Sequence, residues 1–89
     1  MTSRTTERFR RCFTALPDPV RRQAREAYKR FIADPGHPGL HFKLIHTQEP
    51  IYSVRVGRDY RAVGVRDGDE MTWYWIGSHA DYDKLLAQM

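Results

Sequence analysis

Two neighbouring strands are predicted by the stretch Ile51-Tyr-Ser-Val-Arg-Val-Gly-Arg-Asp-Tyr-Arg-Ala-Val-Gly-Val-Arg66, which decides the fold. Apolar residues recur with a period of two on both sides of Arg58-Asp59, as expected for half-buried strands. We place strands at 51–57 and 60–66, joined by a two-residue turn at Arg58-Asp59. Two further strands are predicted at 40–46 and 70–77. Three of the four strands should therefore form an antiparallel meander.

The turn also predicts which side chains share a face of the sheet. With two turn residues, the opposite pairs are Val56 and Arg61, Val54 and Val63, and Tyr52 and Val65. These pairs would form the core face, with Arg61 at its rim. The other face would carry Ser53, Arg55, Ala62 and Gly64, which make either a shallow floor for a ligand or a plain solvent-exposed surface. A shift of one residue would invert this assignment.

Helices are predicted before and after the strands. Phe9, Cys12, Phe13 and Leu16 recur at helical spacing, and Thr5 or Thr6 can cap their helix. A second helix follows, with Asp18 as its N-cap and Pro19 at its first position, and Asp34-Pro35-Gly36 ends it. Its apolar face consists of Val20, Ala24, Ala27, Tyr28, Phe31 and Ile32. A short terminal helix is predicted near residues 80–88. The predicted fold is α+β, with an N-terminal helical hairpin packed on a four-stranded, mainly antiparallel sheet and a short C-terminal helix.

Length and composition narrow the class of protein. The chain has 89 residues, a mass of 10.5 kDa and a hydrophobic fraction of 40%, so we expect one domain over residues 1–89. A lone cysteine, Cys12, cannot form an intrachain disulfide, and the N-terminus lacks the apolar stretch of a secretory signal. The longest apolar run, residues 73–76, is far shorter than the ~20 residues that span a bilayer. We therefore expect a soluble cytoplasmic protein.

The charge of the chain changes along its length. Fifteen Lys and Arg against eleven Asp and Glu give a net charge of +4. Residues 1–33 carry nine basic and three acidic residues, whereas residues 67–89 carry one and five. A basic surface of this kind attracts nucleic acid and, equally, an acidic protein partner. Charge alone therefore leaves both partners open, together with a plain solvated helix face.

Two groups of residues could carry chemistry. Arg55, Arg58 and Arg61 lie on adjoining strands, where guanidinium groups can hold a phosphate; the structural alternative is pairing of Arg58 or Arg61 with Asp59 or Asp67. After the last strand comes Gly77-Ser-His-Ala-Asp-Tyr-Asp83. In this segment a histidine can transfer a proton and a tyrosine can stack on a base, while the serine caps the final helix.

Metal binding and serine hydrolysis are both poorly supported. The four histidines are His37, His41, His46 and His79, and no cysteine pair accompanies them. His41 and His46 are separated by an odd number of residues, so in a strand they would face opposite ways. A Ser-His-Asp hydrolase would need a nucleophile elbow, and the sequence has none. We therefore expect no metal and no other cofactor.

Taken together, these motifs resemble the RelE/ParE superfamily of type II toxin–antitoxin toxins over about residues 6–85. The likeness rests on the helical hairpin followed by Tyr52-Ser-Val-Arg55-Val, by Asp59-Tyr60-Arg61-Ala-Val and by Ile76-Gly77-Ser-His79 with Tyr82. The ending from Trp75 to Asp83 is similar to that of YafQ-type toxins. The resemblance implies a small α/β toxin that is neutralised by a cognate antitoxin. RelE-type members cut mRNA in the ribosomal A site without metal, through attack of the 2′-hydroxyl on the adjacent phosphate.

By position, the resemblance assigns roles to four residues. Arg61 matches the arginine that stabilises the transition state, and His79 matches the general acid of YafQ-like members. Arg55 matches a basic strand residue near the scissile phosphate, and Tyr82 a positioning aromatic residue. We add Lys43 and Arg58 as substrate-binding residues.

The sequence also departs from the family pattern. Arg55 stands where YafQ-like members have a histidine, and only Lys43 and Glu49 lie where RelE-type members often have two lysines or a glutamate. The general base is thus unassigned. The leading interpretation is a ribosome-dependent mRNA endonuclease that inhibits translation. The alternatives are a ParE-like toxin that binds gyrase and a non-catalytic homologue that only binds its antitoxin.

Overall fold

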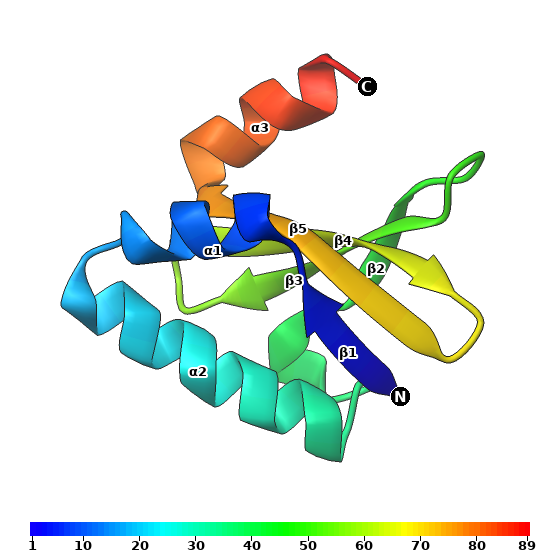
Figure 1. Ribbon diagram of the computed structural model, residues 1–89, viewed down its shortest axis with the longest axis horizontal. Helices are drawn as coiled ribbons and strands as arrows, with labels where there is room; N and C mark the ends of the chain where they lie inside the picture. The colour runs from blue at the N-terminus through cyan, green and yellow to red at the C-terminus, as the bar shows by residue number, and fades with distance from the viewer.

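A mixed five-stranded sheet with three helices forms the computed structural model, which describes residues 1–89. The elements in chain order are β1 (Thr2–Thr5), α1 (Glu7–Thr14), α2 (Asp18–Ala33), the 3-10 turn η1 (Pro38–Leu40), β2 (Lys43–His46), β3 (Ile51–Val56), β4 (Tyr60–Asp67), β5 (Glu70–Ser78) and α3 (His79–Ala87). Figure 1 shows α1 and α2 as a hairpin beside the sheet and α3 at the end of β5. None of the helices is long and apolar enough to cross a membrane.

The strand order is β1-β5-β4-β3-β2, and every pair is antiparallel except β1 with β5. The predicted α+β fold and its meander are confirmed. Strand β1 was not predicted, because Thr2-Ser-Arg-Thr5 is polar and has no apolar alternation. Its extended form depends on hydrogen bonds to distant residues, including Thr2 N to Asp69 O at 2.9 Å and Thr6 N to Trp73 O at 3.0 Å.

The predicted register between β3 and β4 is wrong by one residue. The turn holds Gly57 in addition to Arg58-Asp59, so Val56 lies opposite Tyr60 and Arg55 lies opposite Arg61. Gly57 has a φ of +60°, a left-handed conformation that suits glycine and that converts a two-residue turn into a three-residue one. The faces predicted for β3 are correct, whereas those predicted for β4 are exchanged. Arg61 therefore lies on the same face as Ser53.

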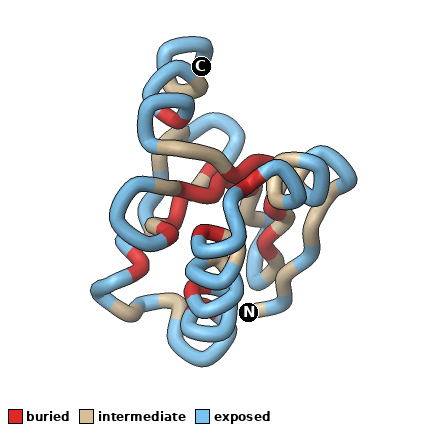
Figure 2. The backbone as a smooth tube through the Cα atoms, turned by 90° about the vertical axis from the view of Figure 1, so that its left-hand side faces the viewer, coloured by how far each residue is buried: buried red, intermediate tan, exposed pale blue.

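Both faces of the sheet are covered. Val54, Val56 and Ala62 pack with Phe31 of α2 in one buried cluster, so Ala62 does not form part of an exposed floor. On the opposite face a second cluster joins four residues, Ile51, Val63, Trp75 and Tyr82. Figure 2 shows the buried segments in the middle of the molecule, whereas most of the C-terminal helix is exposed.

An irregularity in β5 lets one strand serve both clusters. Val63 lies opposite Trp75 and Gly64 opposite Trp73, so Tyr74 has no partner on β4. The extra residue is a β-bulge, which re-aims the side chains that follow it. Trp73 consequently packs in the cluster under α2, and Trp75 packs in the cluster under α3.

The predicted boundaries hold to within a few residues in most places. Thr6 Oγ1 accepts a hydrogen bond from Phe9 N at 3.1 Å, so Thr6 is the cap of α1. Asp18 is the first residue of α2 and Pro17 precedes it in the cap position, so the prediction of Asp18 as N-cap is wrong by one residue. The strand predicted at 40–46 begins only at Lys43, because His41 has a φ of +46° and ends η1.

Candidate functional site

The side chain of Arg61 lies between the sheet and α3. It is only 6% exposed, and its guanidinium carbon lies 5.2 Å from the centre of the Tyr82 ring. Nη2 donates to Ser53 Oγ at 2.9 Å and to the carbonyl oxygen of His41 at 3.2 Å. The guanidinium is therefore held by β3, by the segment before β2 and by α3.

Ser53 and Tyr82 complete this arrangement. The two hydroxyl groups lie 3.2 Å apart, and both residues are buried. We call Ser53, Arg61 and Tyr82 the Arg61 cluster. Within it, Nε of Arg61 is buried and has no hydrogen-bond partner. Because an unpartnered buried donor costs free energy, this atom is a candidate contact for a bound anion.

The electrostatics of the cluster are dominated by burial. Loss of solvent lowers the pKa of the Arg61 guanidinium; Tyr82 opposes this shift and the charge of nearby Arg55 adds to it. None of the ion pairs of the structure involves Arg58 or Arg61. The alternative in which these arginines pair with Asp59 or Asp67 is therefore wrong. Arg61 instead carries a buried positive charge with no carboxylate to balance it.

His79 begins α3 on the solvent side of Tyr82. Its backbone N donates to the carbonyl oxygen of Asp59 at 2.7 Å, which ties the start of α3 to the β3–β4 turn. The imidazole centre lies 5.7 Å from that of the Tyr82 ring, and Nδ1 lies 3.4 Å from Oδ2 of Asp83. The side chain is 57% exposed. Tyr82 thus lies in contact with both Arg61 and the more exposed His79.

Ser78 caps α3, as the sequence predicts. Its Oγ accepts a hydrogen bond from Asp81 N at 3.2 Å. The cap fixes the direction in which the helix leaves β5, and so it fixes where His79 and Tyr82 lie relative to the sheet.

The remaining predicted residues lie around the Arg61 cluster. Arg55 is the direct cross-strand partner of Arg61, and Lys43 is that of Ser53. Direct partners share a face, so Lys43 and Arg55 lie on the face that α3 covers. Arg58 is exposed in the turn next to Asp59, whose carbonyl oxygen binds the first residue of α3. The fold therefore brings Arg55, Arg61, Tyr82 and His79 together, with Lys43 on the same sheet face and Arg58 exposed in the nearby turn.

Two members of the site were not found from the sequence. Ser53 was assigned to an exposed floor, although its position between apolar strand residues was a signal of burial. The carbonyl oxygen of His41 has no sequence signal, because its place depends on the left-handed conformation of that residue.

Two of the histidines, His37 and His46, accept local backbone hydrogen bonds. His37 Nδ1 accepts a hydrogen bond from Gly39 N at 3.0 Å and so caps η1. His46 Nδ1 accepts one from Glu49 N at 3.5 Å. No three His, Cys, Asp or Glu side chains converge as a metal site would require.

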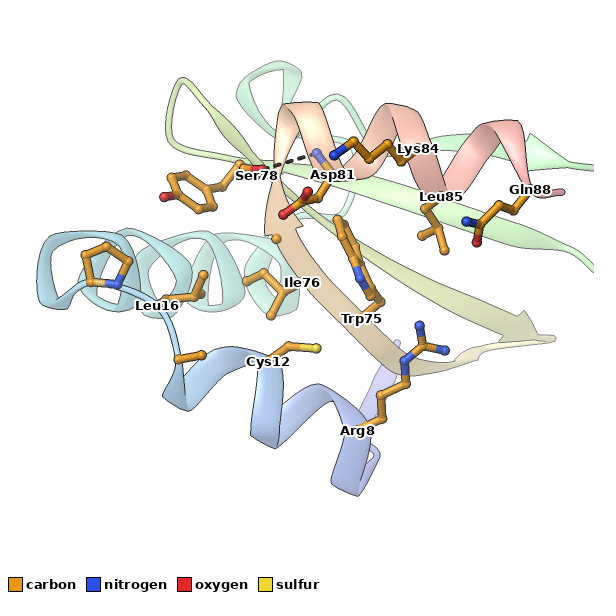
Figure 3. Close-up of a pocket in the computed structure, with 14 residues that line it drawn as sticks. Arg8, Cys12, Leu16, Trp75, Ile76, Ser78, Asp81, Lys84, Leu85 and Gln88 are labelled. Carbon is orange, nitrogen blue, oxygen red and sulfur yellow. Dashed lines mark hydrogen bonds between the residues drawn. The ribbon is translucent and has the colours of Figure 1, made fainter.

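A cleft of about 600 Å³ lies beside the Arg61 cluster, between α1, β5 and α3. Figure 3 shows Trp75 in the middle of this cleft, with Arg8 on α1 and Lys84 and Gln88 on α3. None of the six predicted residues lines it. The predicted site residues thus lie outside this cleft.

Comparisons with known proteins agree with the architecture. The sequence profile of the ParE-like toxin domain matches residues 18–84. No curated protein was found to match the chain in sequence. Among solved structures, RelE in the RelB–RelE antitoxin–toxin complex of Methanococcus jannaschii is similar, with a TM-score of 0.72 at 16% identity over 91% of this chain and 95% of that one.

Two further structures share the fold at the same 16% identity. A chain of the RelE–RelB complex of Pyrococcus horikoshii gives a TM-score of 0.69 over 88% of this chain and 93% of that one. The isolated RelE toxin of Escherichia coli gives 0.67 over 98% of this chain and 96% of that one.

Proposed function

Since the chain belongs to the ParE-like toxin family of the RelE/ParE superfamily, we propose that it is a metal-independent, ribosome-dependent mRNA endonuclease that inhibits translation in the cytoplasm. The observation that carries this proposal is the Arg61 cluster. It holds a buried guanidinium that no carboxylate balances and whose Nε is buried without a hydrogen-bond partner. A phosphodiester supplies the missing negative charge and the acceptor oxygen.

The reaction is an internal transfer at phosphorus. The 2′-oxygen of one nucleotide bonds to the adjacent phosphorus, the bond from phosphorus to the 5′-oxygen breaks, and a 2′,3′-cyclic phosphate forms. The proton of the 2′-hydroxyl passes to a base that we leave unassigned. The leaving 5′-oxygen takes up a proton from an acid, so that atoms and charge balance.

Each predicted residue has a role in this scheme. Arg61 stabilises the charge that develops on the phosphoryl oxygens, and a donor of this kind is typically worth ~3–4 kcal/mol. His79, which is exposed beside Tyr82, protonates the leaving oxygen. Arg55 and Lys43 hold neighbouring phosphates from adjoining strands. Arg58 binds substrate from the turn, and the ring of Tyr82 positions a base by stacking.

Access to Arg61 requires movement of Tyr82. The ring covers the guanidinium, and Arg61 is only 6% exposed. A phosphate therefore reaches Nε or Nη2 when the Tyr82 ring turns away or when α3 lifts from the sheet. The hydrogen bonds to Ser53 and His41 keep the guanidinium in place during that movement.

An antitoxin is the proposed protein partner, and the helical hairpin offers a surface for it. A groove of about 350 Å³ between α1 and α2 is lined by Phe9, Phe13 and Ala24, with Tyr28 45% exposed beside them. Its rim is basic and consists of Arg10, Arg25 and Lys29. An apolar groove with a basic rim fits an amphipathic helix whose polar residues are acidic.

A second candidate function follows from the family profile, which is that of ParE-like toxins. In this alternative the chain acts by binding gyrase and cleaves no RNA. The Arg61 cluster would then have a structural role, and substitution of Arg61 would change stability without any effect on RNA.

Both functions are tested with the purified chain. We expect cleavage of a reporter mRNA in a reconstituted translation system, with 2′,3′-cyclic phosphate ends mapped to the ribosomal A site. Cleavage should persist in EDTA at a concentration that leaves ribosomes intact. In parallel, gyrase-dependent DNA supercoiling should be unaffected. If the mRNA stays intact and supercoiling is inhibited, the endonuclease function is wrong and the gyrase-binding function is supported.

A further inference from the structure

A second groove lies on the other side of α2 from the apolar one. It has a volume of about 610 Å³ and runs between α2, η1 and the end of β3. Arg22 and Arg30 line it from α2, and Arg55 lines it from β3. Its remaining wall contains Gly39 and Gly57, where the backbone approaches α2. We call it the Arg22 groove.

The three arginines of the Arg22 groove have no acidic partners. Arg22, Glu26 and Arg30 follow one another at intervals of four residues and so share one face of α2. Glu26, the acidic member of this face, also lines the groove, but it pairs with Lys29 at 3.6 Å, and none of the ion pairs of the structure includes Arg22, Arg30 or Arg55. The lining thus carries three positive charges against one negative charge. The groove is therefore positively charged.

Arg55 connects the Arg22 groove to the Arg61 cluster. Its Nε donates to the carbonyl oxygen of Gly57 at 2.9 Å, which keeps its guanidinium next to the groove. At the same time Arg55 is the cross-strand partner of Arg61. Strand β2 pairs only with residues 51–53 of β3, so on the side away from β4 Arg55 has no strand partner, and η1 packs against β3 there instead. Arg55 therefore lines the Arg22 groove and also adjoins the Arg61 cluster.

We propose that the Arg22 groove binds the sugar–phosphate backbone of single-stranded RNA next to the phosphate that Arg61 holds. This inference rests on the proposed nuclease function and extends its substrate contacts. The lining favours a phosphate backbone over a protein helix, because it presents arginines and glycines where the groove between α1 and α2 presents aromatic rings. Guanidinium groups bind phosphate oxygens through two parallel hydrogen bonds.

The test measures binding separately from cleavage. The probe is a fluorescent oligouridine with 2′-O-methyl groups, which cannot be cleaved because the attacking hydroxyl is blocked. We expect the double variant Arg22→Ala, Arg30→Ala to bind it at least tenfold more weakly than the unchanged protein. The slope of log affinity against log salt should fall by about 1.4, since each lost contact to a single strand contributes about 0.7.

The matched control is Arg4→Ala, Arg11→Ala. It also removes two arginines, but these lie on the surface and pair with Glu70 and Glu7. We expect it to retain the affinity and the salt slope. An equal loss in both double variants would overturn the proposal, because net charge would then explain binding.

Other outcomes separate this inference from the proposed function. If the unchanged protein cleaves mRNA and the Arg22→Ala, Arg30→Ala variant binds oligouridine fully, the result overturns RNA binding in the Arg22 groove and still supports the nuclease function. Loss of oligouridine binding in the Arg22→Ala, Arg30→Ala variant alone, in a protein that cleaves no mRNA, would support RNA binding in the Arg22 groove and overturn the nuclease function. Weakened antitoxin binding with unchanged oligouridine binding would assign the groove to a protein partner and overturn the inference.

Discussion

Nη2 of Arg61 lies 2.9 Å from Oγ of Ser53 and donates a hydrogen bond to it inside the folded chain. The same oxygen lies 3.2 Å from the Tyr82 hydroxyl, so one small side chain links β4 to α3. This contact makes the proposed catalytic arginine part of the folded interior, and it allows stability and chemistry to be tested separately.

Ser53→Ala is expected to lower the free energy of unfolding by about 1–3 kcal/mol, because it removes a buried partner of both Arg61 and Tyr82. Urea denaturation measures the change. Tyr82→Phe removes only the hydroxyl on the other side of the 3.2 Å contact. In the double variant the two losses should be less than additive, since they delete the same interaction. Full additivity would show that the two hydroxyl groups do not interact.

Arg61→Ala is expected to lower the rate of mRNA cleavage about 10²–10³-fold, from loss of ~3–4 kcal/mol of transition-state stabilisation. Arg61→Lys should restore little, because an ammonium group cannot replace the planar fork that reaches Ser53, His41 and the phosphate at once. Single-turnover cleavage on programmed ribosomes measures both rates. Circular dichroism shows whether each variant is folded. An unfolded Arg61→Ala protein together with a fully active Arg61→Lys protein would indicate that Arg61 has a purely structural role.

His79→Ala should lower cleavage 10²–10⁴-fold, the range typical of a lost general acid. Because the side chain is 57% exposed, the thermal unfolding midpoint should stay unchanged. Asp83→Asn is the matched control, since it alters the 3.4 Å neighbour of His79 and leaves the imidazole. We expect Asp83→Asn to retain most activity. Full toxicity of His79→Ala in cells would remove the assignment.

Tyr74 should make the protein less stable in alkali. Burial raises the pKa of its phenol above the ordinary value of 10.0, and this outweighs the opposing charge of Arg8. The folded chain thus keeps the phenol proton at a pH at which the unfolded chain loses it, so the free energy of unfolding falls as the pH rises past about 10. Urea unfolding below and above that pH measures the free energy of unfolding, which should fall less in Tyr74→Phe than in the unchanged protein. Tyr28→Phe, at an exposed ring, is the control, and equal falls in the unchanged protein and in Tyr74→Phe would contradict the argument.

Tyr28→Glu should weaken antitoxin binding at least tenfold, because it places a negative charge in the groove between α1 and α2, where the acidic partner helix would lie. Calorimetric titration of the product of the adjacent gene, where one is encoded, measures the affinity. Tyr28→Phe keeps the apolar ring and should bind as the unchanged protein does. Unaltered binding by Tyr28→Glu would place the antitoxin on another surface.

The features predicted correctly from the sequence are those that depend on local periodicity. The apolar positions of α2 and the alternation in residues 51–66 were sufficient for the helical hairpin and the meander, and Ser78 was sufficient for the cap of α3. The features missed depend on partners far along the chain or on single backbone angles. Strand β1 needs β5, and the left-handed Gly57 moves Arg61 onto the other face.

The roles given to the six site residues stay predictions, but the fold brings Arg61, Tyr82 and His79 close together. Antiparallel pairing of β4 with β5 puts Arg61 opposite Gly77, two residues before His79. The burial of Arg61 under Tyr82 could not be predicted from the sequence, because it depends on the observed register and on the angle at which α3 leaves the sheet.

The parallel pairing of β1 with β5 has a consequence for the biosynthesis of the protein. Thr2–Thr5 are synthesised long before their partners, Glu70–Trp73. Tyr82, which closes the Arg61 cluster, is made later still. Contacts of such high sequence separation form slowly and only after the intervening residues have been synthesised. A nascent chain therefore carries its arginines on the ribosome well before it can assemble the site, which would form only after Tyr82 has been synthesised.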